Sequence, residues 1–412
     1  MEILYRCCAG LDVHVKTVVA CLIKEGKRAT RTYSTMTDDL LALLDWLVAE
    51  GCTHVAIEST GVYWRPVFNL LEGHLEVILV NARHIKAVPG RKTDVKDSEW
   101  LAELLRHGLL KASFIPPAEI RELRELSRYR QTLVKDQAAI ANRIQRIIES
   151  GNIKLGQVAS DCLGVSGRRM LRALADGETD GEKLALLAQG RLKQKQAELA
   201  RALSGRLSSA QRFVLSELLD RYGELEAALA KVNEAIEREV AQCNDPFVRE
   251  ALRLLQTIPG VGRLVAEVIV AEIGVEMSRF GSEKHLSSWA GMCPGNNESA
   301  GKQKSGKTRK GSKSLRAALV QAAWAATHTK GTYLAAQYRR LVKRKGRKKA
   351  LVAVGHSILV IVYHVLMRKQ SYHELGGDYF EKHQRETYCH RLVKQLESLG
   401  MEVTLKELPA AA

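Results

Sequence analysis

Three strand-like runs follow one another at the start of this chain, and their order constrains the fold more than any other feature. The runs are Ile3 to Asp12, Val13 to Ile23 and Arg28 to Met36, and each is rich in β-branched or apolar residues. Three strands therefore come before any helix. Thr37 and Asp38 can cap the helix that follows, whose leucines recur on one face.

After this first helix, strands and helices alternate. His54 to Glu58 and Leu75 to Val80 read as short buried strands, and residues 62–71 and 81–88 read as helices. The resulting order, β-β-β-α-β-α-β-α, is that of the ribonuclease-H-like and RuvC-like nuclease fold. In that fold, acidic residues at strand ends gather over one edge of the sheet. We therefore predict an α/β, RuvC-like nuclease domain over residues 1–115.

Four acidic residues stand at the ends of these predicted elements. Asp12 closes the first run, Glu58 ends a buried strand, and Asp94 and Asp97 lie three apart at a predicted helix start, on one helix face. A carboxylate that ends a buried strand is costly unless it is paired or metal-bound. Oxygen-only ligands favour Mg²⁺ or Mn²⁺ over zinc, and two such ions can assist phosphodiester cleavage. The alternative is that Asp94 and Asp97 only complement a helix dipole.

Charge and cysteine usage narrow the class of protein. The formal net charge of +17 favours a polyanionic partner, with an anionic membrane surface as the competitor. The eight cysteines show no CxxC pair or zinc-type spacing, which favours reduced thiols over a disulfide framework. The sequence does not begin with a charged n-region, an apolar stretch and a cleavage site, so we do not expect secretion. The apolar run Ala350 to Met367 contains two histidines and follows a dense basic stretch, so we expect a buried core helix there and no membrane span.

Residues 116–248 are predicted to be helical. Ala118 to Ser150 has the apolar spacing of one long helix, and Gly151 to Gly190 is broken by glycines into short helices. Leu192 to Val240 has heptad-like spacing, which suits a coiled coil and hence a dimerisation region. A simple helical hairpin is the alternative.

Residues 249–370 are predicted to form a mostly α C-terminal domain, followed by a tail over 371–412. Ile258 to Gly262 (IPGVG) lies between two apolar helices and matches a helix-hairpin-helix. Backbone N–H groups at Gly260 and Gly262 would then face a DNA phosphate. The alternative is a structural turn between two helices.

The most basic segment follows that turn. Residues 302–349 contain sixteen Lys and Arg and no acidic residue, which predicts salt-dependent binding to nucleic-acid phosphates. The cations proposed to contact the backbone are Lys302, Lys304, Lys307, Arg309, Lys310, Lys313 and Arg316. Ser299 precedes them in a Gly/Asn-rich turn. A serine needs an activating base or metal to attack, and Ser305, Ser312 and Ser314 lie close by, so spacing alone does not choose among the serines.

Several motifs together resemble one family. AGLDVH, IESTGVYW, GRKTDVKDSEWLAEL, IPGVG, WAGMCPGNNESAGKQKSGK and the tail YHELGGDYFEKH are similar to the insertion-sequence-110 family of bacterial transposases, also described as bridge-RNA-guided recombinases. The resemblance implies a metal-binding DEDD tetrad at Asp12, Glu58, Asp94 and Asp97. It also implies that Ser299 attacks the DNA phosphate and forms a transient phosphoserine link.

The resemblance further implies the partners and the compartment. These are the DNA of the element ends and target, a structured guide RNA encoded by the element, and other copies of the chain in a dimer or tetramer. The expected location is the bacterial cytoplasm, at the nucleoid. Because the tetrad and Ser299 lie about two hundred residues apart, a site built from two subunits is consistent with the sequence.

The sequence departs from the family pattern at two places, and two alternative functions are also compatible with it. Ala300 follows the serine where glycine is common, and the helical insert over residues 151–203 is longer than compact members need. The alternative enzyme is a RuvC-like junction-resolving nuclease that uses a metal-activated water and no covalent intermediate. The other alternative is a nucleic-acid-binding protein without catalytic activity.

Overall fold

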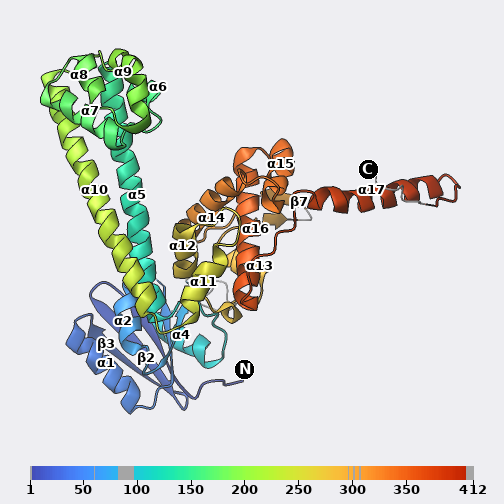
Figure 1. Cartoon of the computed structure of the whole chain (residues 1–412). Coiled ribbons are helices and arrows are strands. Elements are labelled where there is room, and N and C mark those ends of the chain that lie inside the picture. The colour runs from blue at the N-terminus through green and yellow to red at the C-terminus, as the bar shows by residue number, and fades with distance from the viewer. Residues whose placement is uncertain are drawn as a thin grey trace. The chain divides into compact units, whose positions relative to one another are not determined.

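The computed structural model describes residues 2–59, 61–81, 97–295, 297–299, 302–305 and 308–404 (Figure 1). The chain divides into two compact units, Met1–Ile115 and Pro116–Ala412. The first unit contains a mixed α/β sheet, and the second is mostly helical.

The sheet of the first unit has five strands in the order β3-β2-β1-β4-β5. The strands are β1 (Cys7–Val13), β2 (Thr17–Lys24), β3 (Lys27–Ser34), β4 (His54–Glu58) and β5 (Glu76–Val80). β1, β2 and β3 pair antiparallel, whereas β4 pairs parallel with both β1 and β5. The predicted order of strands and helices is confirmed as far as β5. The strand boundaries differ by a few residues from those predicted.

Three helices of the first unit are described: α1 (Thr37–Ala49), α2 (Trp64–Leu71) and α4 (Asp97–Arg106). The predicted capping of α1 is wrong, because Met36 is the N-cap and makes no side-chain capping hydrogen bond. Instead, the hydroxyl of Ser34 donates to Asp39 in the first turn. The helix predicted over 81–88 falls outside the described residues except for Asn81.

The two faces of the sheet pack against different helices. One face contributes Leu11 and Ile57 to a core shared with α1 and α2, and the other contributes Cys8 and Ala56 to a core shared with α4. Gly10 allows α4 to approach closely, since a Cβ there would lie 2.3 Å from the Ser98 carbonyl oxygen. This close packing holds the first turn of α4 against β1.

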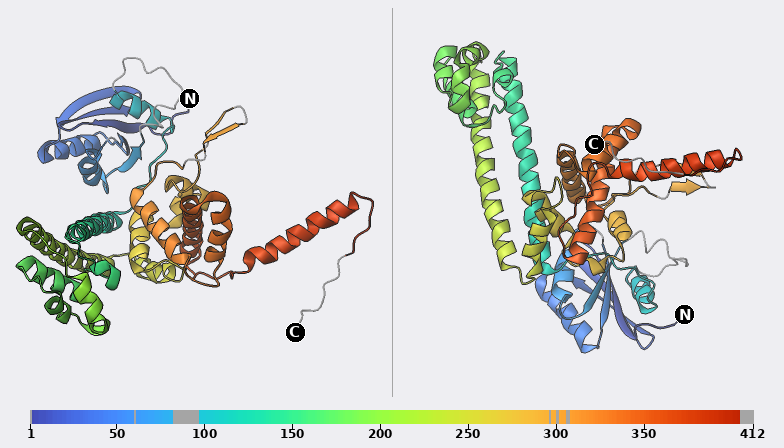
Figure 2. Two further views of the ribbon diagram at one scale, coloured as in Figure 1. Left: turned by 90° about the horizontal axis from the view of Figure 1, so that it is seen from above. Right: turned by 45° about the vertical axis from the view of Figure 1, so that its right-hand side comes forward.

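Two long helices, α5 (Ala118–Ser150) and α10 (Ser209–Gln242), lie side by side in the second unit (Figures 1 and 2). Short helices join them at one end: α6 (Leu155–Val158), α7 (Val165–Asp176), α8 (Gly181–Leu186), η1 (Gly190–Lys195) and α9 (Gln196–Ala202). The buried side of α10 carries the predicted heptad residues Leu215, Leu219, Leu225, Val232 and Ile236. α5 of the same chain packs along α10, so the helices form the alternative arrangement, a helical hairpin.

The rest of the second unit is a helical domain with one small hairpin. It comprises α11 (Phe247–Leu255), α12 (Arg263–Ile273), η2 (Met277–Arg279), α13 (Glu283–Trp289), β6 (Asn297–Ser299), β7 (Lys302–Ser305), α14 (Lys313–Ala326), α15 (Tyr333–Lys345), α16 (Arg347–Arg368) and α17 (Tyr379–Glu397). α16 is the only helix in the described part of the chain that is long and apolar enough to cross a membrane. It packs against α11, α13, α14 and α15, and half of its apolar stretch is buried, as expected of the predicted core helix.

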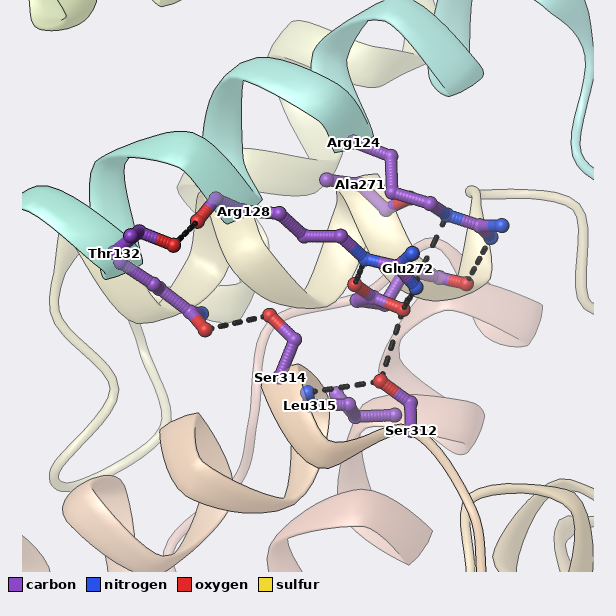
Figure 3. A network of polar contacts seen from close by, with 9 residues as sticks. Arg124, Arg128, Thr132, Ala271, Glu272, Ser312, Ser314 and Leu315 are labelled. Atoms are coloured by element: carbon purple, nitrogen blue, oxygen red, sulfur yellow. Dashed lines mark hydrogen bonds and ion pairs between the residues drawn. The ribbon is translucent and has the colours of Figure 1, made fainter. Parts of the chain in front are cut away.

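Buried ion pairs attach α5 to α12. Arg130 donates to Glu267 at 2.5 Å, and both side chains are almost fully buried. Arg128 binds the Glu272 carboxylate with two hydrogen bonds of 2.7 and 2.9 Å, and Arg124 donates to the last carbonyls of α12 (Figure 3). Paired arginine and carboxylate groups offset the cost of burying each charge.

These contacts change the acidity of Glu272. Burial alone would raise the pKa of this carboxyl, but the hydrogen bonds and charge of Arg128 and the charge of Arg124 outweigh burial, and the net pKa is lowered. Glu272 is therefore ionised in the folded protein down to a lower pH than an ordinary glutamate. Its contribution to stability is present above the ordinary glutamate pKa and is lost as the pH falls through the lowered value.

Gly10→Ala is expected to lower the free energy of unfolding by about 2 kcal/mol, because the added methyl group overpacks the contact between β1 and α4. Gly223→Ala is the matched control. Gly223 lies exposed in α10 with nothing near its Cβ position, so alanine there is expected to stabilise by about 1 kcal/mol. Urea unfolding followed by circular dichroism measures both, and equal midpoints would contradict the close packing of α4.

Glu272→Gln is expected to lower the melting temperature at pH 7, because it removes charged hydrogen bonds worth about 2 kcal/mol. The difference from the parent protein is expected to shrink as the pH falls below 4.5, the ordinary value for glutamate, because the carboxyl then takes up a proton first in the unfolded parent protein and, at a lower pH, in the folded one. Glu276→Gln is the control, because its pair with Arg279 is solvent-exposed. A difference that stays constant down to pH 3 would show that the charge of Glu272 is unimportant.

Candidate active site: an acidic sheet end and a serine hairpin

Asp12 and Glu58 lie next to each other at one end of the sheet. β1 and β4 run parallel with Leu11 opposite Ile57, so the next residues along, Asp12 and Glu58, continue the same register. Leu11 and Ile57 face the core of α1 and α2, and side chains alternate along a strand. Asp12 and Glu58 therefore belong to the opposite face, which α4 covers.

Asp97 reaches the same end of this face. It is the first residue of α4, and its neighbour Ser98 contacts β1 at Gly10, two residues before Asp12. The structure thus brings three of the four predicted tetrad positions, Asp12, Glu58 and Asp97, to one end of one sheet face. Asp94 lies outside the described residues.

The carboxylates present fit a hard divalent cation by donor type, because all are oxygen ligands. Among the described residues, however, no three His, Cys, Asp or Glu side chains lie close enough together to hold a metal ion. Asp12 instead pairs with His14, whose Nε2 lies 3.1 Å from the carboxylate. His14 was not among the site residues predicted from the sequence. The available signal was its position two residues after Asp12 in the motif AGLDVH, one residue beyond the end of β1.

Ser299 is the last residue of the short strand β6. β6 and β7 pair antiparallel, with Ser299 opposite Lys302 and Glu298 opposite Gln303. The predicted serine therefore stands at the tip of a two-stranded hairpin. Residues 300 and 301, which join the strands, are outside the described residues.

Two close glycine contacts define the base of this hairpin. The chain that enters it and the chain that leaves it form a bridge between Pro294 and Thr308. A Cβ on Gly291 would lie 2.7 Å from the Arg309 carbonyl oxygen, and one on Gly311 would lie 2.3 Å from the backbone of Ala290. At both positions the neighbouring backbone leaves no room for a side chain, so glycine is required.

Ser312 connects the hairpin base to the buried ion pairs. Its hydroxyl donates to Glu272 at 3.0 Å and accepts the N–H of Leu315 at 3.2 Å, which caps α14 (Figure 3). Ser314 donates to Gln131 of α5 at 2.6 Å. Both hydroxyls therefore have structural partners on α5 or α12, which makes them weaker candidates for a nucleophile.

The predicted backbone-binding cations divide into three groups. Arg309, Lys310 and Lys313 are exposed. Arg316 is half-buried and donates to the Thr308 hydroxyl at 2.6 Å, so it also supports the hairpin base. Lys302 and Lys304 belong to β7, and Lys307 lies outside the described residues.

A second exposed basic cluster was not named residue by residue from the sequence. It lies where α15 ends and α16 begins and comprises Lys343, Arg344, Lys345, Arg347, Lys348 and Lys349. None of these six forms an ion pair with a carboxylate in the part of the chain that the structure describes. Unpaired exposed cations of this density attract a polyanion.

The segment predicted to be a helix-hairpin-helix consists of α11, a turn and α12. Gly260 in the turn has φ of +84°, and its Cβ would lie 2.2 Å from the Ala322 carbonyl oxygen, so packing against α14 already requires glycine. Arg263, the first residue of α12, pairs with Glu237 and Glu267. Phosphate binding by the N–H groups of Gly260 and Gly262 stays a prediction.

Two family models match this chain, one over the acidic sheet end and one over the serine hairpin. Residues 9–152 match a DEDD transposase model of the IS110 type, and residues 252–339 match the model described as "Transposase IS116/IS110/IS902 family". The first range contains Asp12, Glu58 and Asp97, and the second contains the hairpin with Ser299. Together the two ranges cover more than half of the chain.

Similar proteins of known type align over most of the chain. The transposase for insertion sequence element IS1111A of Coxiella burnetii is 25% identical over 88% of this chain and 90% of its own length. The pilin gene-inverting protein of Moraxella bovis is 24% identical over 88% of this chain and 96% of its own length. The mini-circle putative transposase for IS117 of Streptomyces coelicolor is 26% identical over 63% of this chain. The resemblance noted in the motifs is thereby confirmed, and the chain belongs to the IS110 family of transposases, enzymes that recombine DNA.

Proposed function

We propose that this transposase cuts and rejoins DNA through a covalent bond between Ser299 and a DNA phosphate. The observation that carries the proposal is the hairpin itself, which presents Ser299 at its tip above a base built from Gly291, Gly311 and Ser312. A fixed base with a serine at the tip suits a nucleophile that must reach a phosphate held outside the fold.

The bond changes balance without an added reactant. The Ser299 oxygen attacks the phosphorus as its hydroxyl proton is lost, and the bond from phosphorus to one deoxyribose oxygen breaks. That oxygen leaves as a hydroxyl after it takes up a proton. The energy of the phosphodiester is kept in the phosphoserine bond, so a hydroxyl of another DNA end can attack it and release Ser299.

We propose that the acidic sheet end assists this reaction with Mg²⁺ or Mn²⁺. Asp12, Glu58 and Asp97 would hold the ion together with Asp94, and the ion would supply positive charge at the reacting phosphate. His14 holds the Asp12 carboxylate at its place on β1. The five-stranded order of the sheet supports a RuvC-like fold for this unit.

The exposed cations of the second unit would hold the nucleic-acid backbone. Arg309, Lys310 and Lys313 follow the hairpin directly, and the cluster at the start of α16 adds a second patch. Such contacts release counterions and make binding salt-dependent. We propose that they serve both the DNA and a structured RNA encoded beside the gene, as the family resemblance implies.

Ser299→Ala is expected to abolish the covalent protein–DNA adduct and strand exchange while DNA affinity changes less than about threefold, because only the nucleophile is removed. The measurement is a protease-sensitive adduct on labelled DNA that contains the element junction, with Mg²⁺, with and without RNA transcribed from the flanking noncoding region. Ser305→Ala is the matched control, since Ser305 lies in the same hairpin on β7.

Three results would distinguish serine attack guided by RNA from its alternatives. Adduct formed by Ser299→Ala would contradict the serine assignment. Cleavage by the parent protein without any adduct would support attack by water, as in a junction-resolving nuclease. Adduct that forms equally without RNA would contradict the need for a guide.

Glu58→Gln is expected to reduce adduct formation at least 100-fold, because a ligand of the proposed metal is lost. Glu76→Gln is the control, since Glu76 is exposed on β5 opposite His54, at the other end of the sheet. Adduct yield is measured as a function of Mg²⁺ and Mn²⁺ concentration. Unchanged yield and metal dependence in Glu58→Gln would remove this carboxylate from the proposed site.

A further inference from the structure

α14 presents one continuous exposed stripe, of which the proposed function uses only Lys313. Lys313, Ala317, Gln321 and Trp324 are all exposed and follow one another at intervals of four, four and three. At 3.6 residues per turn, this spacing places them within about 80° of arc on one side of the helix. The opposite side is buried and includes Ala322 and Ala326, against which the turn at Gly260 packs.

Trp324 dominates this stripe. Its side chain is 60% exposed, although burial of a large aromatic side chain normally stabilises the folded protein. Its ring lies 4.6 Å from the ring of His328, and the two planes make an angle of 55°. His328 Nδ1 lies 2.9 Å from the Trp324 carbonyl oxygen, which also accepts the Thr327 hydroxyl at 2.7 Å. Trp324 and His328 thus form a pair of exposed rings in contact, and the His328 ring is fixed by its hydrogen bond to the Trp324 carbonyl oxygen.

The segment of chain that carries this pair is basic or neutral. Lys313 stands at the other end of the stripe, and Lys330 is exposed two residues after His328. The whole segment 302–349 has no acidic residue. A partner that fits such a surface carries negative charge and offers a flat apolar face to an aromatic ring. Unpaired nucleic acid meets both conditions, because its phosphates pair with Lys and its bases stack on aromatic side chains.

We propose that Trp324 is a stacking site for an unpaired nucleobase, on a strand that runs along α14 from the serine hairpin. Lys313 follows the hairpin base, and Trp324 lies about 17 Å farther along the helix. Ala317 and Gln321 between them leave room for the backbone and offer one polar group. Bases inside a duplex are covered by their neighbours, so the site selects a strand that has left its duplex. Only the starting point of that strand rests on the proposed role of Ser299.

The test measures binding, so it does not require catalysis. All proteins carry Ser299→Ala in the full-length chain, and fluorescence anisotropy follows labelled 12-mers of single-stranded DNA, of single-stranded RNA and of duplex DNA. Trp324→Ala is expected to weaken binding of the single strand about 10-fold and leave duplex binding unchanged. Trp324→Phe keeps a ring and is expected to stay within about threefold of the parent protein.

Two further variants separate stacking from charge. Phe213→Ala is the matched control, since Phe213 is an equally exposed aromatic residue, 66% accessible, on α10. It is expected to leave all affinities unchanged. Lys313→Ala is expected to flatten the salt dependence of binding, whereas Trp324→Ala lowers affinity at every salt concentration without changing that slope. A larger loss with RNA than with DNA, or the reverse, identifies which strand occupies the site.

Other outcomes overturn the proposal. Equal single-strand affinity of Trp324→Ala and the parent protein would do so. Equal losses for single strand and duplex would mean that Trp324 supports the fold of α14 and does not stack. A change of oligomeric state in light scattering, with single-strand binding intact, would assign the stripe to contact between copies of the chain. Failure to form a serine adduct affects none of these measurements, so the two proposals fail independently.

Discussion

The packing of the second unit depends on the pairing of arginines from α5 with two glutamates buried in α12. Apart from these two, the buried positions of α12 are all apolar, and a charged group in such a position costs several kcal/mol unless a partner compensates it. Arg130 and Arg128 supply that compensation for Glu267 and Glu272. Apolar contact alone would allow α5 to slide or rotate on α12, whereas two charge pairs permit one arrangement.

That arrangement determines where the serine hairpin begins. Glu272 receives the hydroxyl hydrogen of Ser312, and this leaves the Ser312 oxygen free to accept the N–H of Leu315. The cap of α14 is therefore oriented by a carboxylate that belongs to another helix. The base of the candidate catalytic segment therefore combines a polar network with close backbone contacts.

Much of the first unit could be predicted from the sequence, because its signals are local. Strand runs and leucine spacing give the order of elements, and a carboxylate that ends an apolar run, such as Glu58, stands out against its neighbours. The register that places Asp12 beside Glu58 is a property of strand pairing. It became visible only in the sheet. The role of Asp94 and the metal stay predictions.

The second unit shows where local signals end. Heptad spacing in α10 correctly indicated a helix with one buried face, but the same spacing serves a partner from another chain or from the same chain, and here α5 occupies it. Glu267 and Glu272 look like surface residues of a helix until their arginine partners, more than 130 positions earlier, are brought close. Long-range pairs of this kind leave no periodic trace in a sequence.

The two ends of α5 have different surroundings: Arg124 to Arg130, near its start, bind α12, while its other end carries α6 to α9. The twenty residues beyond Arg130 extend about 30 Å. The Arg128–Glu272 contact therefore joins the anchored end of α5, through the Ser312 hydroxyl, to the base of the serine hairpin.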